Sequence, residues 1–349
     1  MRRLPVYFLI DVSESMVGVP IEKVQDGIAT IIKELRTDPY ALETVFISII
    51  VFAGKAQKIT PLVEIFNFYP PKLPIGGGTS LGNAMNFLIS DLNRSLQKTT
   101  INQKGDWKPL IFLFTDGNPT DNYKVSFERW NNEYKTKANL IIISLGENID
   151  SSIFNKITEN VLLLKNTDAE SFKKFFKWVT ASIKTSSLNV VDSNDDGLHL
   201  EPITNGYLSK IDLTKGFDKK IDENFAVILG KCQVTKQLYL IKYQKRLSPS
   251  EFKELALNTL DYKLVGAFPI ANSYYDLCEG EQIKQTIRSS ELVGFPNCPC
   301  CGNQFGFALC KCGNILCVGE EKISRCPWCD SQLQFGFSEG GIDIKRTRG

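Results

Sequence analysis

The chain has 349 residues, enough for two or three domains that each bury a core of their own. Its 41 basic and 39 acidic residues nearly balance, so charge alone gives no reason to expect a nucleic-acid or anionic-membrane partner. No stretch reaches the roughly 20 apolar residues of a membrane span. Asp11 interrupts the apolar stretch after Arg2 and Arg3 too early for a secretory signal. We therefore expect a cytoplasmic protein with no membrane partner.

The N-terminal half alternates apolar runs with amphipathic segments. Buried strands are predicted at 6–10, 45–52, 110–114, 140–145 and 161–164, with a hairpin arm at 56–65. Helices are predicted at 17–35, after the glycine loop at 76–78, at 123–138 and at 170–183. This order predicts an α/β domain over residues 1–190, a doubly wound and mostly parallel sheet with helices on both faces.

Oxygen-bearing side chains follow three of these segments. Asp11, Ser13 and Ser15 come directly after the first strand, Thr79 follows the glycine loop, and Asp116 follows the strand at 110–114. Ligands of open parallel sheets bind outside the carboxyl ends of the strands. Two carboxylates and three hydroxyls form an all-oxygen set that suits a hard cation, Mg²⁺ or alternatively Mn²⁺ or Ca²⁺.

The spacing of this set resembles the metal-ion-dependent adhesion site of the von Willebrand factor A family. The family pattern is DxSxS, then Thr in a glycine-rich loop, then Asp after a central strand, and all five positions agree. The resemblance covers roughly residues 4–187. It implies a cation that keeps one coordination position open for an exposed Asp or Glu of a protein partner, and no catalysis.

Two acidic neighbours of the set receive other interpretations. Asp121, in the DGNPTD segment, is predicted to form a turn or cap a helix rather than bind metal. Glu14, between the two serines, is expected to face solvent.

The sequence changes character after a polar, turn-prone linker at 191–200 that includes Ser193–Gly197. Strand-like runs at 225–229, 237–243 and 262–268 predict a β-rich domain over 201–349, with a zinc ribbon at 296–332. The only histidine, His199, is expected to be an ordinary linker residue.

Eight of the ten cysteines lie between Cys298 and Cys329, and clustered cysteines in a cytosolic protein are more often metal ligands than disulfides. The turns that begin at Cys298-Pro and Cys326-Pro are near-copies of one another. They favour one tetrahedral zinc on four sulfurs. The favoured ligands are Cys298, Cys301, Cys326 and Cys329. A second centre, or a rearranged set that uses Cys310, Cys312 and Cys317, stays open.

The two halves together resemble the TerY family, whose tail is the TerY-C metal-binding domain. The residues that carry this resemblance are Gly230-Lys-Cys232, Leu264–Pro269, Leu292–Gly302 and Cys326–Cys329. Similar proteins occur in bacteria beside a protein kinase and a metal-dependent Ser/Thr phosphatase, in systems linked to tellurite resistance, stress and phage defence. The resemblance implies such partners here.

Three classes of function compete. The first is a non-enzymatic scaffold whose Mg²⁺ docks a partner's acidic residue. The second is a Mg²⁺-dependent phosphohydrolase. The sequence argues against it, because it lacks a second carboxylate set, a catalytic histidine and a P-loop lysine. The third is a nucleic-acid factor, which the near-neutral charge disfavours.

Overall fold

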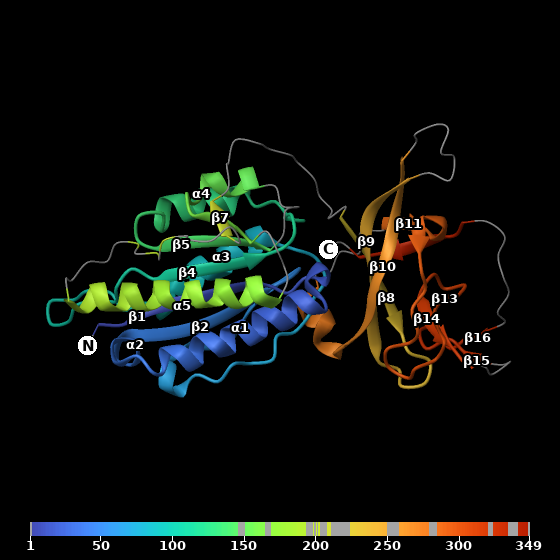
Figure 1. Ribbon diagram of the computed structural model, residues 1–349, viewed down its shortest axis with the longest axis horizontal. Coiled ribbons are helices and arrows are strands. Elements are labelled where there is room, and N and C mark those ends of the chain that lie inside the picture. Colours follow the sequence, from blue (N-terminus) through green and yellow to red (C-terminus); the bar gives the residue numbers. More distant parts are fainter. Residues whose placement is uncertain are drawn as a thin grey trace. The chain divides into compact units, whose positions relative to one another are not determined.

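The computed structural model describes residues 2–145, 151–164, 169–192, 198, 200, 202, 208–210, 224–249, 258–278, 285–319, 324–333 and 341–347. The chain divides into two compact units (Figure 1). The first unit contains residues 1–12, 18–73 and 79–220, and the second contains 13–17, 74–78 and 221–349. The second unit therefore includes two short N-terminal segments, Ser13–Val17 and Pro74–Gly78. The predicted linker segment Ser193–Gly197 and His199 lie outside the described residues.

The first unit is built on a seven-stranded sheet in the order β3-β2-β1-β4-β5-β6-β7. Five adjacent strands are parallel, and the edge strands β3 and β7 are antiparallel to their neighbours. The strands are β1 (Leu4–Asp11), β2 (Val45–Phe52), β3 (Ala56–Glu64), β4 (Leu110–Thr115), β5 (Asn139–Leu145), β6 (Val161–Leu164) and β7 (Leu208–Lys210). The predicted mostly parallel sheet is confirmed. The sequence placed the start of the second domain at residue 201. β7 lies beyond that residue but belongs to the first sheet, because it pairs with β6.

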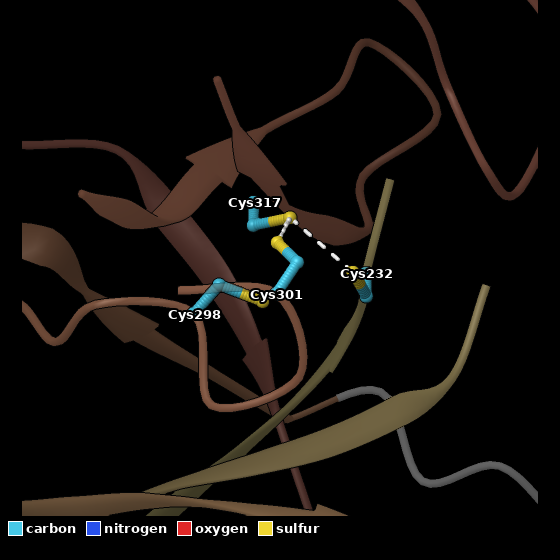
Figure 2. A group of neighbouring side chains, drawn as sticks. All are labelled: Cys232, Cys298, Cys301 and Cys317. Carbon is cyan, nitrogen blue, oxygen red and sulfur yellow. Dashed lines mark hydrogen bonds between the residues drawn. The ribbon is translucent and has the colours of Figure 1, made fainter. Parts of the chain in front are cut away.

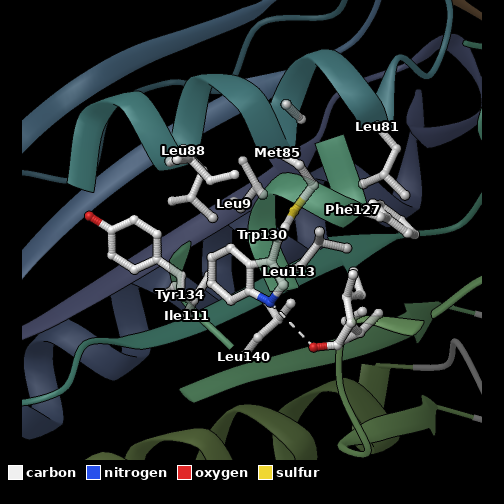
Figure 3. Close-up of a cluster of buried hydrophobic side chains, with 14 of the residues drawn as sticks. Leu9, Leu81, Met85, Leu88, Ile111, Leu113, Phe127, Trp130, Tyr134 and Leu140 are labelled. Atoms are coloured by element: carbon white, nitrogen blue, oxygen red, sulfur yellow. Dashed lines mark hydrogen bonds between the residues drawn. The ribbon is translucent and has the colours of Figure 1, made fainter. Parts of the chain in front are cut away.

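Helices cover both faces of this sheet, which is why its central strands are apolar along their whole length. The helices are α1 (Val19–Leu35), α2 (Pro39–Thr44), α3 (Leu81–Ser95), α4 (Lys124–Glu133) and α5 (Ala169–Asp192). Short 3-10 turns are η1 (Glu14–Met16), η2 (Ile65–Asn67) and η3 (Ser151–Lys156). On one face α3 and α4 pack over alternate residues of the central strands (Figure 3). There the indole N–H of Trp130 donates to the carbonyl of Ile157 at 3.3 Å, so the largest buried side chain is also satisfied.

The opposite face packs against α5 through aromatic rings. Phe114 on β4 stacks on Phe176 with centroids 6.1 Å apart and meets Phe175 edge-on at 5.9 Å. The same helix lies close to α1, since a Cβ added at Gly27 would fall 2.0 Å from the Phe176 ring. Only glycine fits at that crossing.

The second unit is built on a six-stranded sheet in the order β12-β10-β9-β8-β14-β13, with two short two-stranded sheets, β11-β17 and β15-β16. Its main strands are β8 (Phe225–Lys231), β9 (Leu238–Pro249), β10 (Asn258–Ile270), β12 (Leu292–Val293), β13 (Phe305–Leu309) and β14 (Ile315–Val318). The smaller elements are η4 (Asn272–Leu277), β11 (Gln285–Arg288), η5 (Ser289–Glu291), β15 (Ser324–Arg325), β16 (Gln332–Leu333) and β17 (Asp343–Arg346).

Both faces of this second sheet are packed, and alternate residues of β9 go to different faces. Tyr239, Ile241 and Tyr243 join an apolar cluster that includes several cysteines. Leu238 and Leu240 join a second cluster, which contains Val17 and Ile75 from the two N-terminal segments. The predicted β-rich C-terminal domain is confirmed.

Candidate metal centres

Two of the predicted oxygen ligands lie at the carboxyl ends of adjacent parallel strands. Asp11 ends β1 and Asp116 follows β4, and the two strands pair in parallel with Ile10 opposite Phe114. The two segments touch, since the hydroxyl of Thr115 donates to Oδ2 of Asp11 at 2.7 Å. Both carboxylates are buried.

The threonine of the glycine loop is tied to the segment that follows Asp116. The backbone N–H of Thr79 donates to the hydroxyl of Thr120 at 3.0 Å, and the N–H of Thr120 donates to the carbonyl of Thr79 at 2.9 Å. This reciprocal pair fixes Thr79 against the loop after β4. Thr120 was not singled out from the sequence, because hydroxyls in turns are common and only the pairing reveals its role.

The two serines follow Asp11 by two and four residues and belong to the second unit. Their side chains are buried and their hydroxyl oxygens lie 3.0 Å apart.

The acidic neighbours divide into one correct and one wrong expectation. Asp121 accepts hydrogen bonds from the backbone N–H groups of Gly82 and Asn83 at 3.1 and 2.9 Å, so it caps the start of α3 as predicted. Glu14 is only 1 % exposed, which overturns the expectation that it faces solvent. It accepts from Gly78 N at 2.8 Å and from the Tyr274 hydroxyl at 2.6 Å, within the second unit. Burial and the charge of Glu14 raise the pKa of Tyr274.

Sulfur ligands gather in a first group around β8 and β14 (Figure 2). Cys232 directly follows β8, Cys317 lies on β14, and Cys298 and Cys301 come from the turn before β13. β8 and β14 pair in parallel, which brings Cys232 and Cys317 together. The Sγ atoms of Cys317 lie 3.8 Å from those of Cys301 and Cys232.

A second group holds the other four clustered cysteines, Cys310, Cys312, Cys326 and Cys329. Cys310 and Cys312 lie in the turn between β13 and β14, while the other two lie in the turn between β15 and β16. Sγ distances are 3.8 Å between Cys310 and Cys329 and 3.9 Å between Cys312 and Cys326. A tetrahedral zinc with Zn–S bonds of about 2.3 Å separates its sulfurs by about 3.8 Å. Both groups therefore have the spacing of a four-sulfur zinc centre.

The favoured quartet of Cys298, Cys301, Cys326 and Cys329 is not brought together. Each of the two similar turns contributes two sulfurs, but to a different group. The other two sulfurs of the quartet at the Cys298 turn come from β14 and from the residue after β8. The other two sulfurs of the quartet at the Cys326 turn come from the turn between β13 and β14. Cys310, Cys312 and Cys317, the open alternatives, all join a group. Cys232 was missed as a ligand because it lies far upstream of the cluster in sequence.

The sequence comparisons agree with this two-part organisation. Residues 6–178 match the model of the von Willebrand factor type A domain, and residues 222–349 match that of the TerY-C metal binding domain. The chain is a von Willebrand factor type A domain joined to a TerY-C metal binding domain. Metal binding by the cysteine-rich TerY-C domain follows from the family and from the sulfur geometry together.

Individual relatives match only part of the chain. Inter-alpha-trypsin inhibitor heavy chain H2 of Mus musculus is 29% identical over 153 residues, which is 42% of this chain and 15% of the relative. Heavy chain 4 of the same inhibitor family is 30% identical over 123 residues, 33% of this chain and 12% of the relative. The chain thus spans less than a sixth of these relatives.

Solved structures show similarity over about half of the chain. A von Willebrand factor type A protein from Catenulispora acidiphila has 14% identity and a TM-score of 0.40, covering 52% of this chain and 43% of that one. Proximal thread matrix protein 1 from the mussel byssus, described with a zinc-occupied MIDAS motif, has 17% identity and a TM-score of 0.38, covering 53% and 46%.

The surroundings of the TerY-C sulfurs suit a bound zinc. Backbone N–H groups donate to three ligand sulfurs: Gln233 to Cys317 at 3.2 Å, Thr235 to Cys232 at 3.3 Å and Trp328 to Cys326 at 3.4 Å. Such donors favour thiolate. Burial nevertheless raises the pKa of Cys326 to about 12. A divalent cation removes this penalty, because it binds the thiolate form directly.

Two cysteines stand outside both groups. Cys300 lies beside the first group, and burial together with the charge of Cys298 raises its pKa to about 12. Cys278 lies after η4, where its thiol donates to the carbonyl of Tyr274 at 3.2 Å. Neither belongs to a quartet. Eight cysteines therefore form two complete sets.

Over the described residues, no helix combines the length and the apolar character that crossing a bilayer requires.

Proposed function

We propose that this protein is a non-enzymatic, metal-dependent interaction protein. A Mg²⁺ ion, for which Mn²⁺ or Ca²⁺ can substitute, is held by Asp11, Ser13, Ser15, Thr79 and Asp116. An exposed Asp or Glu of a partner protein completes its coordination. Two Zn²⁺ ions in the TerY-C domain support the fold that accompanies this site.

The observation that carries this proposal is the convergence at the edge of the first sheet. Asp11 ends β1 and Asp116 follows the neighbouring parallel strand β4, while Thr79 is hydrogen-bonded to the loop that follows Asp116. Only two of the five oxygen donors are anionic, so the charge of a divalent cation is not overcompensated. Mg²⁺ readily keeps water in its coordination shell. Exchange of one such water for a partner's carboxylate gives a charge-assisted bond without any chemical reaction.

The proposed partners are a Ser/Thr kinase and a metal-dependent phosphatase, in a bacterial stress, tellurite-resistance or defence system. This assignment extends the TerY resemblance, and the phosphorylation partners would present the acidic residue. A cytoplasmic location agrees with the sulfur chemistry, since eight thiols retained as metal ligands belong in a reducing compartment.

Two other functions are weaker. In the part of the chain that the structure describes, the groups of three or more His, Cys, Asp or Glu side chains close enough to share a metal ion consist of cysteine alone. A two-metal phosphohydrolase centre of the usual carboxylate type therefore has no counterpart there. A nucleic-acid role lacks an electrostatic basis, because the net charge is only +2.

The test is binding of the purified kinase and phosphatase at matched ionic strength, with Mg²⁺ or with EDTA. Asp11→Ala and Thr79→Ala should abolish Mg²⁺-dependent binding and leave the circular dichroism spectrum unchanged. Asp26→Ala, an exposed acid on α1, is the matched control and should bind like the wild type. Equal binding in EDTA would refute the proposal. Turnover of p-nitrophenyl phosphate that is lost in Asp116→Ala would favour the phosphohydrolase instead.

A further inference from the structure

The second unit contains, besides the TerY-C domain, the two segments that carry or precede three of the proposed cation ligands. Ser13–Val17 includes both serines, and Pro74–Gly78 ends at the residue before Thr79. The contacts of these segments inside the second unit therefore bear directly on where the ligands lie.

One buried carboxylate joins three parts of this unit. Glu14, between the two serines, accepts from the backbone N–H of Gly78 at 2.8 Å with one oxygen. Its other oxygen accepts from the hydroxyl of Tyr274 in η4 at 2.6 Å. Glu14 and Tyr274 are 1 % and 5 % exposed. A buried carboxylate is costly without donors, so this position is specified by its two hydrogen bonds.

A buried cation holds the same segment from the main sheet. The ammonium of Lys242, on β9, donates to the backbone carbonyl of Ser15 and, at 3.5 Å, to that of Val17. It also lies 4.4 Å from the centroid of the Phe225 ring. Lys242 occupies the β9 face that carries Leu238 and Leu240, and Val17 belongs to the same apolar cluster as both leucines. Polar and apolar contacts thus fix the same short stretch of backbone.

The glycine segment is fitted just as closely. A Cβ added at Gly77 would fall 2.8 Å from Sγ of Cys278, 3.0 Å from Oε1 of Glu14 and 3.1 Å from Oη of Tyr274. Gly78 has a φ of 86°, in the left-handed region that favours glycine. The backbone reaches the carboxylate of Glu14 only because both positions lack a side chain.

We propose that Tyr274, through Glu14, is a positioning residue for the cation site, so that the affinity of the site for its metal depends on the contacts of Ser13–Val17 and Pro74–Gly78 inside the second unit. Tyr274 orients Glu14, which in turn fixes Gly78 next to Thr79 and the turn between Ser13 and Ser15. Ligands held in place before binding lose less conformational freedom when the cation arrives, and affinity rises accordingly. This inference rests on the proposed function, because it requires a cation at that site.

The main sheet of the second unit gives the coupling a physical route. Lys242 and its apolar neighbours occupy one face, while Tyr239, Ile241 and Tyr243 on the other face pack with Cys232, Cys298 and Cys317. The same strand therefore contacts a zinc quartet on one side and Ser13–Val17 on the other. By reciprocity of linked binding, a cation at the oxygen site must stabilise the second unit as much as that unit favours the cation.

The test measures Mn²⁺ affinity of the zinc-loaded full chain by calorimetry and by electron paramagnetic resonance, well below the unfolding temperature. Tyr274→Phe removes one hydroxyl and no charge, and it should weaken Mn²⁺ binding about fivefold to tenfold. Tyr275→Phe is the matched control. Tyr275 is the next residue and is 50 % exposed, so this variant should bind Mn²⁺ like the wild type. Zinc content should be the same in all three proteins.

A second variant and a second readout complete the test. Gly77→Ala should weaken Mn²⁺ binding because its added methyl group crowds Glu14 and Tyr274. This variant tests the inference independently if Tyr274→Phe does not fold. Saturating Mg²⁺ should raise the unfolding temperature of the second unit more in the wild type than in Tyr274→Phe. Unchanged Mn²⁺ affinity in folded Tyr274→Phe or Gly77→Ala overturns the inference and leaves the proposed function standing. Absence of Mn²⁺ binding by the wild type, or its persistence in Asp11→Ala, overturns both.

Discussion

The two units of this chain build their cores from different materials. The first buries aromatic and aliphatic side chains on both faces of a parallel sheet, with Trp130, Phe112 and Phe114 among the largest. In the second, cysteines take part in the apolar clusters: Cys232, Cys298 and Cys317 in one, Cys310 and Cys326 in another. The first unit is held by packing, whereas we expect the second to be held by packing and zinc.

The same contrast applies to the metals themselves. Each cysteine quartet offers four sulfurs and fills the tetrahedral shell of zinc, so it leaves no position for a ligand from outside. The oxygen set offers donors to an ion that prefers six, so it leaves room for a partner. We therefore propose that one chain combines closed centres suited to structure with an open centre suited to recognition.

The largest effect that tests this contrast is zinc removal. A strong chelator at neutral pH should unfold the TerY-C domain, because structural zinc contributes on the order of 10 kcal/mol per site to folding. The first unit should stay folded. Hydrogen exchange measured by mass spectrometry should show lost protection in peptides from 224–249 and 285–319, with protection kept in β1 and β4. Unchanged protection of both units in zinc-free protein would contradict a structural role for the metal.

Removal of single ligands separates the two quartets. Cys232→Ser should reduce the zinc content from two ions per chain to one and lower the stability of the second unit by several kcal/mol. Cys300→Ser, the matched control outside both quartets, should retain two ions. Elemental analysis of the purified variants decides the result. Full zinc content in Cys232→Ser would return the assignment to the quartet of Cys298, Cys301, Cys326 and Cys329.

The first unit should respond to a packing defect instead. Phe114→Ala removes a buried ring from between Phe8, Phe175 and Phe176, and such truncations cost about 3–5 kcal/mol. Thermal unfolding should show this loss in the first unit at unchanged zinc content. Phe66→Ala, at a ring that is 74 % exposed, should have little effect. A loss of stability in Phe114→Ala that depends on zinc would contradict the proposal that packing alone holds the first unit.

The sequence predicts the first unit well because its signals are local. Each central strand is an apolar run, and Asp11 and Asp116 directly follow such runs, so their place at the sheet edge follows from topology. The same reasoning gives the wrong prediction for Glu14. Its burial depends on Tyr274, which lies 260 positions away in the sequence and carries no local mark of that contact.

The predicted grouping of the cysteines is wrong for a related reason. Two similar turns suggest a single centre when read by spacing, yet each turn supplies only half of a quartet. The pairing of β8 with β14 decides which cysteines join them, and that pairing is a long-range property of the sheet. Residue types were therefore predictable, whereas their grouping was not.

The smallest effect distinguishes a structural acid from a proposed ligand. Asp121 accepts from two N–H groups at the start of α3, and loss of such a cap costs about 1 kcal/mol. Asp121→Ala should therefore lower the unfolding free energy of the first unit by about that amount, with Mn²⁺ affinity unchanged. Asp116→Ala should abolish Mn²⁺ binding, because it removes one of only two anionic donors. Denaturant titrations and Mn²⁺ calorimetry on both variants give the comparison. A loss of Mn²⁺ affinity in Asp121→Ala equal to that in Asp116→Ala would place Asp121 among the ligands and show that the cap and the cation site are one structure.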